Sequence, residues 1–242
     1  MGNNQRANMT PVQEQFSKHA NEYNSNNIIQ QIVSKALVRD ISITPKRILE
    51  LGCGSGQVFK NINFDFEYYK AIDFSQEMCD IHPKHKNLEL VCLNFDTEEF
   101  HKNLENEKYD LILSSSALQW SKDLNKIVRT LSNLSDEINM VLFTSNTFKT
   151  IFELTDTQSP ILDIQSIKDS FDKYYNCEYE ILNYKLEFRN KKELFKYIKN
   201  SGVSGSKKSL SFEQSKHLYK NYDLGYLEFE VVFVKGIKDN NN

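Results

Sequence analysis

The chain has 242 residues, 39% of them hydrophobic and 12% aromatic, and its 30 basic and 33 acidic residues leave a net charge of −3. That composition fills the core of one substantial α/β domain and leaves little room for a second. The near-neutral charge gives no general attraction to nucleic acid or to a membrane surface, and no apolar run approaches the roughly 18 residues of a membrane span.

Cysteine and histidine usage points away from disulfides and metals. The four cysteines are widely separated and include no CxxC pair, a pattern typical of reduced thiols in a cytoplasmic protein. The five histidines lack the spacing of a metal site, so none is expected, and His82 and His85, which flank a Pro-Lys turn, are expected on the surface.

Two helices are expected before residue 45. The first begins at Pro11 and reaches about Tyr23, with Phe16 on the same side. The second follows Asn26 and carries apolar residues at helical spacing from Ile28 to Leu37, which predicts that it packs on a sheet.

From residue 47 onward, short apolar runs alternate with helical patterns. The expected strands are 47–51, 68–72, 88–93, 109–114 and 138–144, and the expected helices are 57–63, 75–82, 97–104 and 123–134. This alternation predicts a doubly wound, Rossmann-like parallel sheet with helices on both faces. The ligand of such a sheet lies beyond the carboxyl ends of its strands.

The C-terminal part predicts a helix at 164–175 and two alternating strands, Tyr179 to Arg189 and Leu227 to Lys235. Asn190 with Glu193, and Ser211 with Gln214, resemble the capping boxes of two more helices. The two strands are expected to extend the sheet to seven, one of them antiparallel, with the helices as a lid. We therefore expect one domain with a helical cap (1–44), a ligand-binding core (45–145) and a sheet extension with a lid (146–238).

The first strand of the core ends in a glycine-rich loop with Gly52, Gly54 and Gly56. Glycines let the backbone take left-handed angles and bring bare peptide groups close to a ligand. The G-x-G-x-x-G fingerprint of dinucleotide-binding proteins would need glycine where Gln57 stands. Glu50, just before the loop, suits a ligand with an ammonium group rather than a phosphate. A turn in an ordinary α/β protein is the plainer interpretation.

Polar residues also follow the later strands. Asp73 ends the second strand, where a carboxylate can accept hydrogen bonds from ribose hydroxyls. The third strand ends in Asn94-Phe95-Asp96, in which either Asn94 or Asp96 can read an adenine amino group and Phe95 can offer its backbone N–H. The remaining candidates are Phe74 and Met78 as an apolar wall for the base, and Ser114, Ser115 and Trp120 after the fourth strand, although Trp120 can equally be a core residue.

At this point the chain resembles a known family. The run from Leu49 to Gly56 is similar to the first motif of class I S-adenosylmethionine-dependent methyltransferases, with Asp73 as their second-strand acidic residue. A closer resemblance is to malonyl-acyl-carrier-protein O-methyltransferases of biotin synthesis. It rests on Phe16-Ser17-Lys18-His19-Ala20-x-x-Tyr23, on Ala117-Leu118-Gln119-Trp120, and on Leu142-Phe143-Thr144-Ser145 with Glu153-Leu154. The third strand departs from the usual Gly-Asp pair, and trans-aconitate methyltransferase carries a similar Gln-Trp.

The resemblance implies methylation of the free carboxylate of a malonyl thioester on an acyl-carrier protein, with S-adenosylmethionine as the cofactor. Tyr23 and Trp120 are then positioning residues, and Tyr23 and Phe16 close over the sulfonium. Residues 185–208 hold eight basic against two acidic residues, so the docking face for an acidic carrier is expected near Lys191, Lys192, Lys207 and Lys208. The alternatives are a methyltransferase for a small free acid and a binding protein without catalysis.

Overall fold

The structure is a computed structural model that describes residues 27–200 and 210–238. The expected helix from Pro11 to Tyr23, with Phe16, lies outside the described residues, and so do Lys207 and Lys208.

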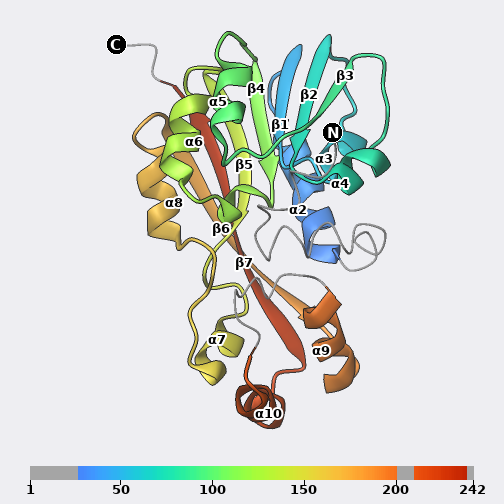
Figure 1. Cartoon of the computed structure of the whole chain (residues 1–242), viewed down its shortest axis with the longest axis vertical. Helices are drawn as coiled ribbons and strands as arrows, with labels where there is room; N and C mark the ends of the chain where they lie inside the picture. Colours follow the sequence, from blue (N-terminus) through green and yellow to red (C-terminus); the bar gives the residue numbers. More distant parts are fainter. Residues whose placement is uncertain (1–26, 201–209, 239–242) are drawn as a thin grey trace.

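A seven-stranded sheet in the order β3-β2-β1-β4-β5-β7-β6 forms the centre of the molecule (Figure 1). The strands β1 to β5 are parallel, whereas β7 runs antiparallel to both β5 and β6. The bounds are β1 Arg47–Leu51, β2 Tyr68–Asp73, β3 Leu88–Cys92, β4 Leu111–Ser115, β5 Glu137–Phe143, β6 Asn176–Glu187 and β7 Tyr226–Ile237. The predicted mostly parallel sheet with one antiparallel strand is confirmed.

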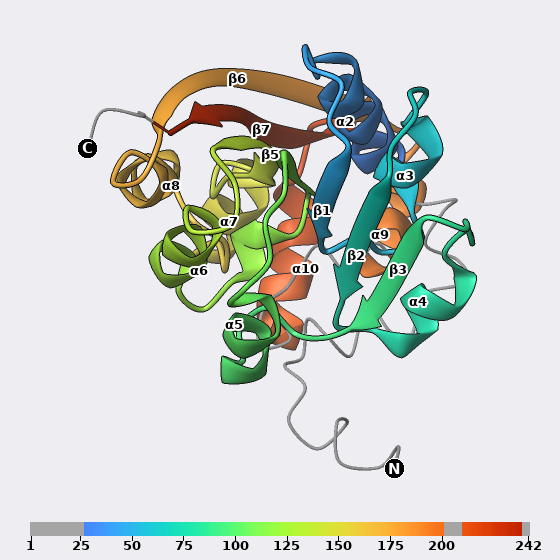
Figure 2. The same ribbon diagram turned by 90° about the horizontal axis from the view of Figure 1, so that it is seen from above.

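Helices cover both faces of this sheet (Figure 2). Helices α2 and α3 share one buried apolar cluster with β1, β4 and β5, and α5, α6 and α8 share a second cluster on the other face. The bounds are α2 Ile28–Arg39, α3 Gln57–Asn61, α4 Gln76–Ile81, α5 Glu98–Leu104, the 3-10 turn η3 Leu118–Trp120, α6 Leu124–Leu131, α7 Lys149–Thr155, α8 Ile164–Phe171, α9 Lys191–Asn200 and α10 Phe212–Asn221. None of the helices in the described part of the chain has the length and apolarity to cross a bilayer.

Capping side chains begin the two helices, α9 and α10, for which the sequence predicted capping boxes. Ser211 and Gln214 form the expected capping box at α10. Asn190 accepts the backbone N–H of Glu193 at 3.0 Å, and its own amide meets the Glu193 carboxylate at 3.2 Å. These contacts satisfy N–H groups that the first turn of a helix leaves without partners.

Helix α7, Lys149–Thr155, was not predicted from the sequence. The residue before it, Phe148, has a left-handed backbone (φ 60°) and no side-chain cap. Contacts with β7 fix the turn instead: the N–H of Phe148 donates to the Glu228 carbonyl at 2.9 Å, and that of Thr150 to the Glu228 carboxylate at 3.1 Å. A short helix that depends on a distant strand leaves no local signal.

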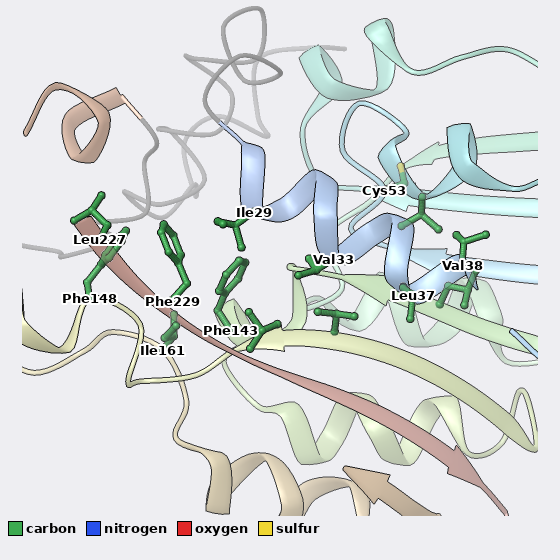
Figure 3. Close-up of a cluster of buried hydrophobic side chains, with 14 of the residues drawn as sticks. Ile29, Val33, Leu37, Val38, Cys53, Phe143, Phe148, Ile161, Leu227 and Phe229 are labelled. Carbon is green, nitrogen blue, oxygen red and sulfur yellow. The ribbon is translucent and has the colours of Figure 1, made fainter. Parts of the chain in front are cut away.

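Strands β6 and β7 form a long antiparallel pair that reaches past the carboxyl ends of the parallel strands. Its far end carries α7, α9 and α10 as a second lobe (Figure 1). The apolar cluster on the α2 face continues into this lobe through Phe143, Phe148 and Phe229, and the Phe229 ring lies 6.0 Å from Phe143 and 5.0 Å from Phe148 (Figure 3). One continuous core therefore joins the sheet to the lobe beyond the strand ends.

Candidate functional site

The carboxyl ends of β1, β2 and β4 meet at the point where the strand order reverses. Strand β1 lies between β2 and β4, and the N–H groups of Gly52 and Cys53 donate to the Ile72 carbonyl at 2.8 and 3.1 Å. This is the position at which open α/β sheets bind ligands.

Gly52 and Gly54 of this loop both have a left-handed backbone, but the missing side chain serves a different purpose at each. Gly52 has φ +69°, and a Cβ added there would lie 2.1 Å from the Cβ of Ala117. Gly54 has φ +51°, but an added Cβ would meet no atom within 4 Å. Gly52 thus allows close packing on the loop after β4, whereas Gly54 leaves space beside the bare backbone.

The Asp73 carboxylate holds the glycine loop in place. Its Oδ2 accepts the N–H of Gly54 at 2.8 Å, and its Oδ1 accepts the N–H of Ser75, the N-cap of α4, at 2.9 Å. Burial raises the pKa of Asp73 to about 6, although these hydrogen bonds oppose the shift. The sequence predicted a sugar contact for Asp73 but not this tether to Gly54.

Glu50 is buried beneath the loop and is 1% exposed. Its Oε2 accepts a hydrogen bond from the Tyr69 hydroxyl at 2.7 Å. Burial raises the pKa of Glu50 to about 8, and the nearby Asp73 charge adds to the shift. A cation bound next to these two carboxylates would favour their ionised forms, so the site suits a positively charged ligand.

The end of β4 and the loop after it present polar atoms that have no hydrogen-bond partner among the described residues. The Ser114 hydroxyl donates to the Leu51 carbonyl at 2.8 Å and so joins β4 to β1. Ser116 has a left-handed backbone (φ 61°), and Gln119 donates to its carbonyl at 2.8 Å. In the described part of the chain no protein group pairs with Ser115 Oγ, Ser116 Oγ or Gln119 Oε1. Ser116 and Gln119 were missed as site residues, because neither strain nor burial can be read from the motif.

Asn94 and Asp96, the two candidates for the adenine contact, follow β3, and the side chain of each accepts a backbone N–H. Asn94 Oδ1 accepts the N–H of Asp96 at 2.9 Å, and Asp96 Oδ1 accepts the N–H of Lys122 at 3.0 Å. Phe95 packs its ring into the core. The two residues expected to form an apolar wall for the base differ in burial. Phe74 is half-buried, whereas Met78 is buried, with 2% of its surface exposed. Trp120 is half-buried against the core cluster of the α2 face.

The expectation that His82 is exposed is wrong. Its side chain is 3% exposed and packs against Phe59, with ring centroids 5.4 Å apart, while His85 is exposed as predicted. A Cβ added at Gly56 would lie 2.9 Å from His82 Nε2. Burial lowers the pKa of His82. Within residues 27–200 and 210–238 no three His, Cys, Asp or Glu side chains are grouped to hold a metal ion.

The residues present fit a ligand with an ammonium group and a sugar. The space beside Gly54 admits a ligand against the backbone, Glu50 is a buried carboxylate that a cation would ionise, and Asp73 is fixed by two N–H donors with lone pairs left for hydroxyls. Tyr23, expected to cover this ligand, lies outside the described residues.

The chain is similar to known methyltransferases. Residues 49–136 match the family described as "Methyltransferase domain". A malonyl-[acyl-carrier protein] O-methyltransferase of Bacillus anthracis is 29% identical over 154 residues, which cover 61% of this chain and 56% of that protein's length. A second protein of that name, from Ilyobacter polytropus, is 28% identical over 220 residues and covers 81% of this chain and 83% of its own.

Solved structures share the fold. The YcgJ protein from Bacillus subtilis has a TM-score of 0.62 at 13% identity and covers 86% of this chain and 98% of its own. The plantazolicin methyltransferase BpumL, solved in complex with SAH, has a TM-score of 0.52 at 16% identity and covers 93% of this chain and 94% of its own.

Alanine at Gly52 is expected to affect mainly stability, and alanine at Gly54 mainly ligand binding. Gly52→Ala should lower the free energy of unfolding by at least about 3 kcal/mol, because left-handed strain adds to overlap with Ala117. Gly54→Ala should cost only about 1–2 kcal/mol of strain but weaken binding of S-adenosylhomocysteine at least about tenfold, because its Cβ enters the ligand's space. Urea unfolding and calorimetry measure the two effects. Equal unfolding free energies, or wild-type binding by Gly54→Ala, would contradict this assignment.

Proposed function

We propose that this chain, a class I S-adenosylmethionine-dependent methyltransferase that resembles the malonyl-acyl-carrier-protein O-methyltransferases, methylates the free carboxylate of a malonyl thioester on an acyl-carrier protein, a step of biotin synthesis. The observation that carries the proposal is the likeness to relatives of that name, one of which matches 81% of the chain and so extends beyond the cofactor core. A cytoplasmic location is part of the proposal.

The cofactor is S-adenosylmethionine, which supplies an electrophilic methyl group when bound. Gly52 and Gly54 present bare backbone, Glu50 offsets the ammonium group, and Asp73 accepts the ribose hydroxyls. Asn94 or Asp96 accepts from the adenine amino group, next to Phe74. The buried carboxylates are already oriented by Tyr69, Gly54 and Ser75, so little reorganisation is needed when the ligand arrives.

The acceptor needs positioning rather than a general base. A carboxylic acid is ionised at neutral pH, and alignment of reacting atoms accounts for a large share of the barrier in such transfers. The Ser115 and Ser116 hydroxyls and the Gln119 carbonyl are polar groups beside the glycine loop that lack protein partners among the described residues, and we assign them with Trp120 to the acceptor side. Tyr23 stays a predicted positioning residue, with Phe16 next to it.

Helix α9 supports a carrier-docking role for the second lobe. Lys192 and Lys196 are exposed on it. Lys191 is already engaged, since it donates to the Tyr219 carbonyl at 3.0 Å and lies 3.7 Å from the Asp223 carboxylate. The lobe lies beyond the carboxyl ends of the parallel strands (Figure 1), so a carrier bound there would be on the cofactor side.

The decisive experiment compares acceptors. The purified protein with methyl-labelled S-adenosylmethionine should esterify a malonyl acyl-carrier protein at least about 100-fold more efficiently, in kcat/KM, than free malonate or trans-aconitate. It should also restore growth without biotin in a host that lacks this methyltransferase. Preference for a free acid would indicate the small-acid alternative. Cofactor binding with no transfer to any acid would indicate a non-catalytic binding protein.

The pH dependence of cofactor binding is expected to reflect the ionisation of the Glu50 carboxyl group. Since its pKa is raised to about 8, the empty site holds a proton at neutral pH that an ammonium group displaces. Affinity for S-adenosylhomocysteine should therefore rise from about pH 6 to 8, by at most about tenfold per unit, with proton release, and level off above. Calorimetry in buffers of different ionisation enthalpy measures both quantities.

Glu50→Gln keeps an acceptor for the Tyr69 hydroxyl and is the matched variant. It should bind more weakly and lose the dependence above pH 7, leaving only the contribution of Asp73, whose pKa is raised to about 6. A wild-type affinity that is constant from pH 6 to 8, or an unchanged profile in Glu50→Gln, would show that Glu50 does not face the ammonium group.

Charge reversal on α9 tests docking. Lys192→Glu with Lys196→Glu should raise KM for the carrier-bound substrate about fivefold with little change in kcat, and should reduce the salt dependence of kcat/KM. The control is Lys84→Glu with Lys86→Glu, the same change in net charge between α4 and β3, at the sheet edge away from β6. Equal effects of the two pairs would contradict docking at α9.

A further inference from the structure

Cys79 of α4 and Cys92 of β3 form a thiol pair next to Asp73. Cys92 is the strand partner of Asp73 in the parallel register. The two thiols donate to consecutive carbonyls, Cys79 to Asp73 at 4.0 Å and Cys92 to Phe74 at 3.5 Å. The neighbouring thiol is also the largest influence on the pKa of each cysteine. The sequence places them thirteen residues apart and gave no sign of this contact.

The two thiols differ in reactivity. Cys92 is half-buried and so accessible to a small oxidant, whereas Cys79 is 7% exposed. Contact with the Cys79 thiol lowers the pKa of the Cys92 thiol, and the same contact together with burial raises the pKa of Cys79. A partly exposed thiol with a lowered pKa beside a second thiol is the arrangement of a cysteine that reacts and a cysteine that resolves.

We propose that Cys79 and Cys92 form a reversible disulfide on reaction with hydrogen peroxide, and that this disulfide weakens cofactor binding at Asp73. The Cys92 thiolate attacks one peroxide oxygen; an S–O bond forms, the O–O bond breaks, and the leaving hydroxide takes a proton to give water. The Cys79 sulfur, losing its proton, then attacks the sulfenic acid; the S–S bond forms, the S–O bond breaks, and a second water leaves. The two thiols supply the two electrons that reduce the peroxide.

The effect of the disulfide on cofactor binding follows from the hydrogen bonds that the two thiols make. Oxidation removes both S–H donors from the carbonyls of Asp73 and Phe74 and links the second turn of α4 to the last residue of β3. The Asp73 carboxylate holds the N–H of Gly54 and of Ser75, so a shift of its backbone is passed to the glycine loop and to the start of α4. This step rests on the proposed cofactor site, whereas disulfide formation does not.

The test uses the full chain with hydrogen peroxide, followed by dithiothreitol. The wild type should lose two titratable thiols and about 2 Da of mass and yield a cross-linked peptide with Cys79 and Cys92. Its dissociation constant for S-adenosylhomocysteine should rise roughly tenfold and recover on reduction. Cys92→Ser and Cys79→Ala should keep their reduced affinity in peroxide. Cys177→Ser, on β6 at the opposite edge of the sheet, should respond as the wild type does.

Each of the other possible outcomes contradicts one part of the proposal. A cross-link that involves Cys53 or Cys177, or oxidation to sulfonic acid without a cross-link, contradicts the assigned pair. A Cys79–Cys92 disulfide with unchanged affinity contradicts the coupling alone, as does equal loss of binding in Cys92→Ser. A reduced protein that binds no S-adenosylhomocysteine contradicts the proposed function and the coupling with it, while the mass measurement still decides disulfide formation.

Discussion

The pair of hydrogen bonds from Gly54 and Ser75 to the Asp73 carboxylate is the constraint on which the site depends. It joins the glycine loop after β1 to the first turn of α4, so the ends of two strands and the start of a helix are fixed by one side chain. A carboxylate that accepts two backbone N–H groups is rigidly oriented. The proposed cofactor site is therefore formed before any ligand binds, and Asp73 holds the loop in place by itself.

Two buried carboxylates under one loop give the site its electrostatic character. Burial disfavours the charged forms of Glu50 and Asp73, which is why their pKa values rise to about 8 and about 6. A cationic ligand would favour the charged forms of the two carboxylates, whereas an anionic ligand would disfavour them further. The site thus discriminates by charge, and this agrees with a sulfonium cofactor that also carries an ammonium group. It also separates this loop from the phosphate-binding loops of dinucleotide folds.

The antiparallel strand β7 decides where the second lobe lies. Because β7 runs against β5, its first residues project beyond the carboxyl ends of the parallel strands, and the antiparallel pair with β6 carries α7, α9 and α10 to the side of the proposed cofactor site (Figure 1). Phe229, between Phe143 and Phe148, continues the core into that lobe. The lobe is consequently packed onto the sheet rather than tethered by a linker, as positioning of an acceptor requires.

The sequence alone determined the parallel sheet, the antiparallel addition, the glycine loop and Asp73, because strand periodicity, helix caps and a run of glycines are local signals. It could not place α7, which depends on Glu228 of β7, or the burial of His82, which depends on Phe59 and Gly56. Only the tertiary structure paired Glu50 with Tyr69, left oxygens of Ser116 and Gln119 without a partner among the described residues, and placed Cys79 next to Cys92. These contacts arise where separate strands end side by side, and proximity of that kind has no period or motif along the chain.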